Sequence, residues 1–261
     1  MRRRPLHPKP AGITPASEVL FGVNPLVEAL RAAPASVDVV WAAPAARSAE
    51  TVVALARSLG VRVEAAERVT LDRLTGGGHH QGVAARVRPF AYVPLERLLG
   101  GGARLLAALD GVTDPQNLGA IIRSAEVLGA GGLVLPRERS APVTPAAVRA
   151  SAGASAHLPV AQVVNLARAL AEAKQHGYWT VALDAAGPSR LRDLPQLERV
   201  VLVIGCEGTG IRPLVLRGCD FRVRIPVRGR VRSLNASVAA GIAFYELAER
   251  LGGGEPDASQ R

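Results

Sequence analysis

At residues 201–210 the sequence reads VLVIGCEGTG, four apolar residues followed by a glycine-rich segment. The apolar run is typical of a central strand in a parallel sheet, because such a strand is covered on both faces. Gly205, Gly208 and Gly210 let the backbone pass close to a planar or charged ligand. Neither a P-loop nor a complete dinucleotide fingerprint occurs here, so the usual nucleotide-binding loops are not indicated. By itself the segment equally fits a plain glycine-rich loop with Glu207 in solvent.

Strands and helices alternate on both sides of this segment. The predicted strands are Leu105–Leu109, Gly132–Leu135, Thr180–Leu183, Val200–Ile204 and Arg222–Ile225. The predicted helices are Leu118–Leu128, Val164–His176 and Ser237–Leu251. This alternation predicts an α/β fold with a parallel sheet covered by helices on both faces. Ligands of such sheets bind beyond the carboxyl ends of the strands.

A shorter alternation precedes it and predicts a small βαβ-type domain. Its expected strands are Val19–Gly22, Val37–Ala42, Val61–Val63 and Gly82–Val87. Helices are expected at Pro25–Ala32 with Asn24 as the cap, along the face made by Val52, Leu55, Ala56 and Leu59, and near Leu71–Leu74. Periodicity lapses before the glycines at 100–102, which indicates a linker. The chain therefore divides into a basic flexible tail (1–17), a first domain (18–90), a linker (91–104), a second domain (105–251) and a flexible tail (252–261).

The charge balance indicates a polyanionic partner. There are 32 Lys+Arg against 22 Asp+Glu, a net charge of +10, and only Lys9 and Lys174 are lysine. Arginine offers phosphate and guanine a planar, bidentate fork. A GC-rich genome explains the choice of arginine over lysine equally well, although it does not explain the sign of the net charge. With 48% hydrophobic residues, the chain is not disordered as a whole.

Membrane and metal sites are not indicated. The longest uncharged stretch, residues 150–167, is interrupted by polar residues, glycine and proline, and the N-terminus lacks the apolar block of a signal peptide. We therefore expect a cytoplasmic protein. Cys206 and Cys219 have no partners at metal-ligand spacing, and the adjacent His79 and His80 project in different directions. No metal is expected.

Polar residues follow a second predicted strand, in DGVTDPQNLGAIIRSAEVLGA at residues 110–130. Asn117 can cap the helix, and Gly119 allows another backbone to approach it. Arg123 lies in an otherwise apolar helical segment. It is either a functional cation or the partner of Glu126, which stands at the favourable i, i+3 spacing.

A third segment, RVRIPVRGRVRSLNASVAA at residues 222–240, carries a concentrated charge. It holds five arginines in eleven positions with no acid among them, which predicts an anionic partner. Ser233, Leu234 and Asn235 then lead into a helix of small residues. Ser233 or Asn235 can cap that helix, and capping explains both residues as well as catalysis does.

Together the three segments resemble the signature motifs of the SpoU, or TrmH-type, RNA 2′-O-ribose methyltransferases of the SPOUT class. The first motif, N-x-G-x-x-x-R, is matched by Asn117, Gly119 and Arg123. The second, G-x-E-x-x-G, is matched by Gly205, Glu207 and Gly210. The third, I-P leading to S-L-N-x-S-x-A, is matched by Ile225, Pro226, Ser233, Leu234, Asn235, Ser237 and Ala239. Val227 replaces a frequent methionine and Ala236 a usual valine, both small apolar changes.

FGVNPLVEAL at 21–30 and HQGVAARV at 80–87 resemble the L30e-like RNA-binding domain of one subgroup of this family. That subgroup modifies a guanosine in the peptidyl-transferase loop of large-subunit (23S) rRNA. The resemblance implies a C-terminal trefoil knot around the parallel sheet. It further implies S-adenosylmethionine bound at Gly205, Gly210, Ile225 and Leu234, and a homodimer with its site completed across the interface.

The reaction that the resemblance implies is methyl transfer to a ribose 2′-hydroxyl. Arg123 is a poor general base, so we expect it to hold the substrate phosphate and stabilise the developing alkoxide. Asn117, Glu207, Ser233 and Asn235 would orient it and the ribose. The alternatives are a tRNA or another rRNA site as substrate, or a catalytically inactive RNA-binding protein. The predicted loop at residues 76–81 could hold the RNA or be a plain turn.

Overall fold

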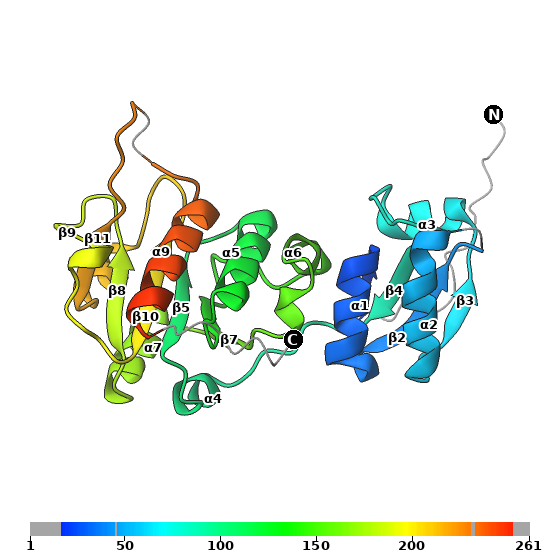
Figure 1. Ribbon diagram of the computed structural model, residues 1–261, viewed down its shortest axis with the longest axis horizontal. Helices are drawn as coiled ribbons and strands as arrows, with labels where there is room; N and C mark the ends of the chain where they lie inside the picture. Colours follow the sequence, from blue (N-terminus) through cyan, green and yellow to red (C-terminus); the bar gives the residue numbers. More distant parts are fainter. Residues whose placement is uncertain (1–16, 45, 231–232, 253–261) are drawn as a thin grey trace, which may run out of the picture. The chain divides into compact units, whose positions relative to one another are not determined.

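The computed structural model describes residues 17–44, 46–230 and 233–252. It divides into two compact units, with the boundary between Pro89 and Phe90 (Figure 1). The predicted tails lie outside the described residues except for Ser17 and Gly252. Within the described part, no helix combines the length and apolar character that a membrane span requires.

The first unit (blue to cyan in Figure 1) is a four-stranded sheet with three helices. Its strands are β1 (Glu18–Phe21), β2 (Val37–Ala42), β3 (Val63–Ala65) and β4 (Val83–Val87), in the order β1-β4-β2-β3. Its helices are α1 (Val23–Ala32), α2 (Glu50–Ser58) and α3 (Arg68–Thr75). β2 and β3 are parallel, as in a βαβ unit, whereas β4 is antiparallel to both of its neighbours.

The predicted cap of α1 is wrong. The helix begins at Val23 with Gly22 at the N-cap, where φ is 97°, and Asn24 lies inside the first turn. Glycine reaches this backbone conformation at little steric cost. The side chain of Gln81, from a distant loop, supplies the acceptor: its Oε1 lies 3.0 Å from the Val23 nitrogen.

The second unit (green to red in Figure 1) contains a parallel seven-stranded sheet with the order β7-β6-β5-β10-β8-β11-β9. The strands are β5 (Leu105–Asp110), β6 (Leu133–Pro136), β7 (Val160–Val163), β8 (Trp179–Leu183), β9 (Ser189–Arg190), β10 (Val200–Gly205) and β11 (Phe221–Arg224). The helices are α4 (Leu95–Gly100), α5 (Pro115–Val127), α6 (Pro145–Ala150), α7 (Leu166–Gln175), α8 (Pro213–Arg217) and α9 (Ala236–Arg250). The predicted α/β class is confirmed, whereas the trefoil knot stays a prediction.

The sheet is covered on both faces, as the apolar runs predicted. Side chains of β5 alternate between two cores: Leu105, Ala107 and Leu109 pack with α5, α6 and α9, whereas Leu106 and Ala108 pack with α4, α7 and α8. This alternation follows from the period of two along a strand. A strand that faces two cores has no polar side, which is why residues 105–109 of β5 and 200–204 of β10 are continuous apolar runs.

Part of the predicted linker is ordered structure. Residues 95–100 form α4, and its Leu98 and Leu99 are buried against the second unit. A Cβ added to Gly132 would meet the Leu98 side chain, so this glycine makes room for the helix. A six-residue helix is too short to show a clear 3.6-residue period, which explains why the sequence suggested a linker.

Candidate active site

The first two motifs begin at neighbouring strand ends. β5 and β10 pair in register from Leu105 with Val200 to Asp110 with Gly205. The first motif follows β5 on α5, and the second occupies the loop that follows β10. Parallel strands present their carboxyl ends at one edge of the sheet, so the topology brings the two motifs together.

Asn235 joins all three motifs. Its Nδ2 donates to Asn117 Oδ1 at 3.0 Å and lies 3.4 Å from Glu207 Oε2. Its Oδ1 accepts from the Ser237 nitrogen at 2.9 Å and from Ser237 Oγ at 2.6 Å, which caps α9. Of the two capping alternatives, the structure selects Asn235. One amide therefore both starts a helix and holds a polar cluster together.

Asn117 is available to this cluster because another residue caps α5. The sequence favoured Asn117 as that cap, which is wrong. Asp114 is the N-cap, and its carboxylate accepts from the backbone nitrogens of Gln116 at 3.1 Å and Asn117 at 3.3 Å. Pro115 occupies the first helical position, where its missing N–H costs no hydrogen bond. The Asn117 side chain remains free to accept from Asn235.

Arg123 is exposed on α5 and makes no hydrogen bond to the cluster around Asn235. It stands six residues beyond Asn117, which is about 9 Å along a helix axis. Within the described part of the chain it forms no ion pair, so the alternative pairing with Glu126 is not made. Gly119 lies between them where α6 approaches: a Cβ added there would stand 2.5 Å from the Ala147 oxygen. The predicted close approach at Gly119 is confirmed.

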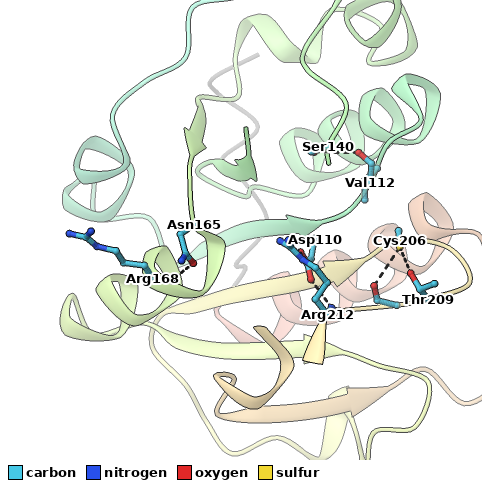
Figure 2. A network of polar contacts seen from close by, with 9 residues as sticks. Asp110, Val112, Ser140, Asn165, Arg168, Cys206, Thr209 and Arg212 are labelled. Carbon is cyan, nitrogen blue, oxygen red and sulfur yellow. Dashed lines mark hydrogen bonds and ion pairs between the residues drawn. The ribbon is translucent and has the colours of Figure 1, made fainter. Parts of the chain in front are cut away.

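The loop of the second motif closes on itself. A Cβ added to Gly205 would stand 2.5 Å from the Ile211 nitrogen, so only glycine fits there. Cys206 and Gly210 form an antiparallel bridge, and Cys206 Sγ lies 2.9 Å from Thr209 Oγ1 (Figure 2). Gly210 has a φ of 68°, which a side chain would strain. The exposed surface of this loop is consequently rich in backbone.

The sequence did not identify an ion pair beneath this loop, between a buried aspartate and an exposed arginine. Asp110, at the end of β5, is fully buried. It accepts from the Arg212 nitrogen and from Arg212 Nε, each at 2.7 Å, and Arg212 Nη2 lies 2.6 Å away (Figure 2). Arg212 stands two residues after Gly210, so the pair fixes the base of the second-motif loop to the strand that leads into the first motif. An acid directly after an apolar strand was the available signal.

The arginine-rich segment is partly neutralised within the chain. Arg222 pairs with Asp184 at 2.6 Å, and Arg224 donates to the carbonyl oxygens of Gly187 and, at 2.6 Å, Pro188. Two of the five arginines are therefore bound within the chain, and the prediction of an anionic partner rests on the others. Arg228 and Arg230 are exposed, and Arg232 lies outside the described residues.

The remaining predicted site residues lie around the same edge without joining the cluster. Ser233 is exposed and makes no hydrogen bond to any described residue. Leu234 is 36% exposed, and Ile225 is partly buried against the core. Across the described ranges no group of three or more potential metal ligands occurs.

Two family models match the chain. The SpoU rRNA methylase family matches residues 104–245, and the substrate-binding domain of RNA 2′-O ribose methyltransferases matches residues 19–93. A Bacillus subtilis protein named as a TrmH family tRNA/rRNA methyltransferase is 41% identical over 204 residues, which are 76% of this chain and 82% of that protein. A Mycobacterium avium protein, named as an uncharacterized tRNA/rRNA methyltransferase, is 43% identical over 77% of this chain. The present chain spans 66% of the length of that relative.

Solved structures show the same architecture in both units. The SpoU methyltransferase AviRb of Streptomyces viridochromogenes, in complex with AdoMet, aligns with a TM-score of 0.78 and 28% identity over 90% of each chain. An AdoMet-bound rRNA methyltransferase of Sinorhizobium meliloti aligns with a TM-score of 0.76 and 29% identity, covering 90% of this chain and 87% of that one.

Proposed function

The chain belongs to the SpoU rRNA methylase family, and from that premise we propose that it methylates a ribose 2′-hydroxyl of RNA. The observation that carries the proposal is the polar cluster in which Asn235 binds Asn117 and Glu207, because it unites all three motifs at the carboxyl edge of the sheet. The match of the first unit to a 2′-O ribose methyltransferase substrate-binding domain supports the 2′-O position.

The second-motif loop and its neighbours fit S-adenosylmethionine as the methyl donor. The loop presents backbone rather than side chains, since Gly205 abuts Ile211 and Gly210 adopts a positive φ. Leu234 and Ile225 add partly exposed apolar surface, suited to a purine ring. When bound, S-adenosylmethionine supplies an electrophilic methyl group on a sulfonium. We assign the cofactor contacts to Gly205, Gly210, Ile225 and Leu234.

The chain's own residues hold and polarise the nucleophile. We assign Arg123 to the substrate phosphate and to the alkoxide that develops at O2′, because its guanidinium has no ion-pair partner among the described residues. Asn235 fixes one carboxylate oxygen of Glu207. The other oxygen remains an acceptor for the ribose hydroxyl. Asn117 and Ser233 complete the orienting set.

The substrate that we propose is a guanosine in the peptidyl-transferase loop of large-subunit rRNA. The resemblance of the FGVNPLVEAL and HQGVAARV sequences to the L30e-like domain of this subgroup supports the choice. A tRNA or another rRNA site is the second candidate, because the curated relatives are named as tRNA/rRNA methyltransferases. We propose a cytoplasmic location, since either substrate would be met there.

We also propose that the protein is a homodimer. On α9, Val238, Ile242 and Tyr245 follow the i, i+4, i+7 spacing of one helix face and are 50%, 41% and 59% exposed. Such an apolar stripe is suited to a second copy of the chain. The substitution Ile242→Asp should shift the protein to monomers in sedimentation, and an unchanged mass would exclude this face.

The test is methylation of deproteinised RNA with labelled S-adenosylmethionine, followed by mapping of 2′-O-methyl groups. Label at one guanosine of large-subunit rRNA is expected, and label in tRNA alone would overturn the rRNA assignment. Calorimetry with S-adenosylmethionine distinguishes an inactive RNA-binding protein, which would give no binding heat. An Arg123→Lys variant that kept near-normal turnover would exclude the bidentate role of this arginine.

A further inference from the structure

In the first unit, the loop from Gly77 to Gly82 and the adjoining face of α3 line an open cleft of about 590 Å³. This volume is in the range of small-ligand sites, which is about 300–1,000 Å³. The lining residues are Ser48, Arg68, Asp72, Gly77, Gly78, His79, His80, Gln81 and Gly82. A cleft that is open to solvent can admit part of a polymer as well as a small molecule.

His80 fixes the loop to α3. Its Nδ1 accepts from the Gly82 nitrogen at 3.0 Å, so the ring proton resides on Nε2. That nitrogen donates to Asp72 Oδ1 at 3.1 Å. The imidazole is buried, whereas the neighbouring His79 is exposed. This confirms that the two histidines project differently and assigns His80 to holding the loop.

Gln81 fixes the other side of the loop. Its side-chain oxygen accepts from the first backbone nitrogen of α1, and its carbonyl oxygen accepts from Ser48 Oγ at 2.8 Å. Gln81 also has a φ of 54°, an uncommon conformation for a residue with a side chain. A loop held from two sides in this conformation has its backbone groups in place before a ligand arrives.

The cleft presents hydrogen-bond donors. Among the described residues, the backbone nitrogens of residues 79, 80 and 81 have no acceptor, and neither has the guanidinium of Arg68. Backbone N–H groups must bond to something, and consecutive free ones form concave sites for anions. Asp72 is the only acid among the lining residues, and His80 already occupies one of its oxygens.

We propose that this cleft binds a phosphate of the RNA backbone, through Arg68 and the backbone nitrogens of residues 79–81. The inference rests on the proposed function, since it makes the first unit the RNA-holding part of the enzyme. A phosphate provides acceptor oxygens for several donors at once, and arginine matches it with two parallel hydrogen bonds. A site for one phosphate adds affinity without reading sequence.

The test compares Arg68→Ala with Arg73→Ala in the full chain. Both arginines are exposed on α3 and both variants remove one charge, but Arg73 does not line the cleft. Binding to deproteinised bacterial large-subunit rRNA is measured from low to moderate salt. We expect Arg68→Ala to lower affinity about tenfold and to flatten the slope of log K against log salt by about 0.7–0.9, the loss of one phosphate contact. Arg73→Ala should stay within about twofold of wild type by the same reasoning.

Equal affinities and slopes in the two variants would overturn the proposal. Binding heat with S-adenosylmethionine should be unchanged in both, because the cofactor residues lie in the other unit. If the wild-type protein bound rRNA but methylated no RNA, the proposed function would fail while the comparison of slopes still decided the role of the cleft.

Discussion

The two ends of β10 use polar side chains in opposite ways. At its amino end, the guanidinium of Arg199 donates its hydrogen bonds to groups within the protein. Nη1 donates to the His176 oxygen at 2.9 Å, and Nη2 donates to the Leu99 oxygen at 3.0 Å and to the Tyr178 hydroxyl at 2.8 Å. The guanidinium also lies over the Tyr178 ring, 4.1 Å from its centre. All these partners are groups of the second unit itself, so Arg199 stabilises the structure of that unit.

At the carboxyl end, polar groups remain available. Asn235 organises Asn117, which is partly buried, and Glu207, which is exposed, and these side chains retain further hydrogen-bonding capacity. Asp110, the one fully buried charge there among the residues that the structure describes, lies beneath the loop and is satisfied by Arg212. The difference indicates that the polar groups at the amino end stabilise the sheet. At the carboxyl end the Asp110–Arg212 pair stabilises the loop, and the polar groups above it remain available to a ligand.

The largest expected effect comes from Arg212→Ala, which removes the ion pair that holds the second-motif loop to β5. It leaves the buried Asp110 carboxylate without its cation, although the backbone N–H of residue 212 still donates to it, so we expect a loss of about 2–3 kcal/mol in the free energy of unfolding. Affinity for S-adenosylmethionine should fall as well, because the second-motif loop loses its anchor. Urea denaturation and calorimetry measure the two effects.

Two further variants test whether the loss of this ion pair explains the expected effect. Asp110→Asn combined with Arg212→Ala should recover part of the stability, since no charge is then buried alone. Arg199→Ala should lower stability through its lost hydrogen bonds while leaving cofactor affinity unchanged. A loss of cofactor affinity as large in Arg199→Ala as in Arg212→Ala would contradict the division between the two ends.

Asn235→Ala should separate catalysis from capping. Loss of the N-cap costs about 1 kcal/mol of stability. Loss of the contacts to Asn117 and Glu207 should lower kcat by about 100-fold, the lower range for removing one preorganised polar group from an active site. The measurement is methyl transfer at saturating RNA and cofactor.

Asn165→Ala is the matched control for this variant. Asn165 caps α7 by accepting from the Arg168 nitrogen at 3.1 Å, and it takes no part in the three motifs. We expect a similar loss of stability with kcat unchanged. Equal kcat values in the two variants would show that Asn235 acts only as a cap.

The smallest effect is a pH dependence at the amino end. Burial raises the pKa of Asp220, but hydrogen bonds from Lys174 and Thr180 outweigh it and lower the pKa below its usual 3.8. A depressed pKa in the folded state means that Asp220 stabilises the protein above about pH 4 and that this contribution is lost as the pH falls further. Unfolding midpoints between pH 6 and 3 should fall less steeply in Asp220→Asn than in wild type. Parallel curves would exclude this contribution.

The fold and the site differ in how far the sequence predicts them. Each of the five strands predicted in the second unit is present to within one residue at either end, because apolar runs and glycine boundaries are local signals. The strand β7 was not predicted, because Val160–Val163 lies within a long uncharged stretch in which no charged residue marks where the strand begins or ends. The motif spacing identified Asn117, Glu207 and Asn235 as site candidates. It did not show that Asn235 is the link between the other two.

The sequence by itself determined the α/β class, the two-unit organisation, the family motifs and an excess of positive charge. The tertiary structure decided which arginines remain available, because Asp184 pairs with Arg222 across 38 positions of the chain. It also paired Asp110 with Arg212 and bound His80, in the loop of the first unit, to Asp72 on α3. Periodicity and spacing report a residue's immediate neighbours along the chain, whereas hydrogen bonds and ion pairs depend on contacts that exist only after the strands have aligned.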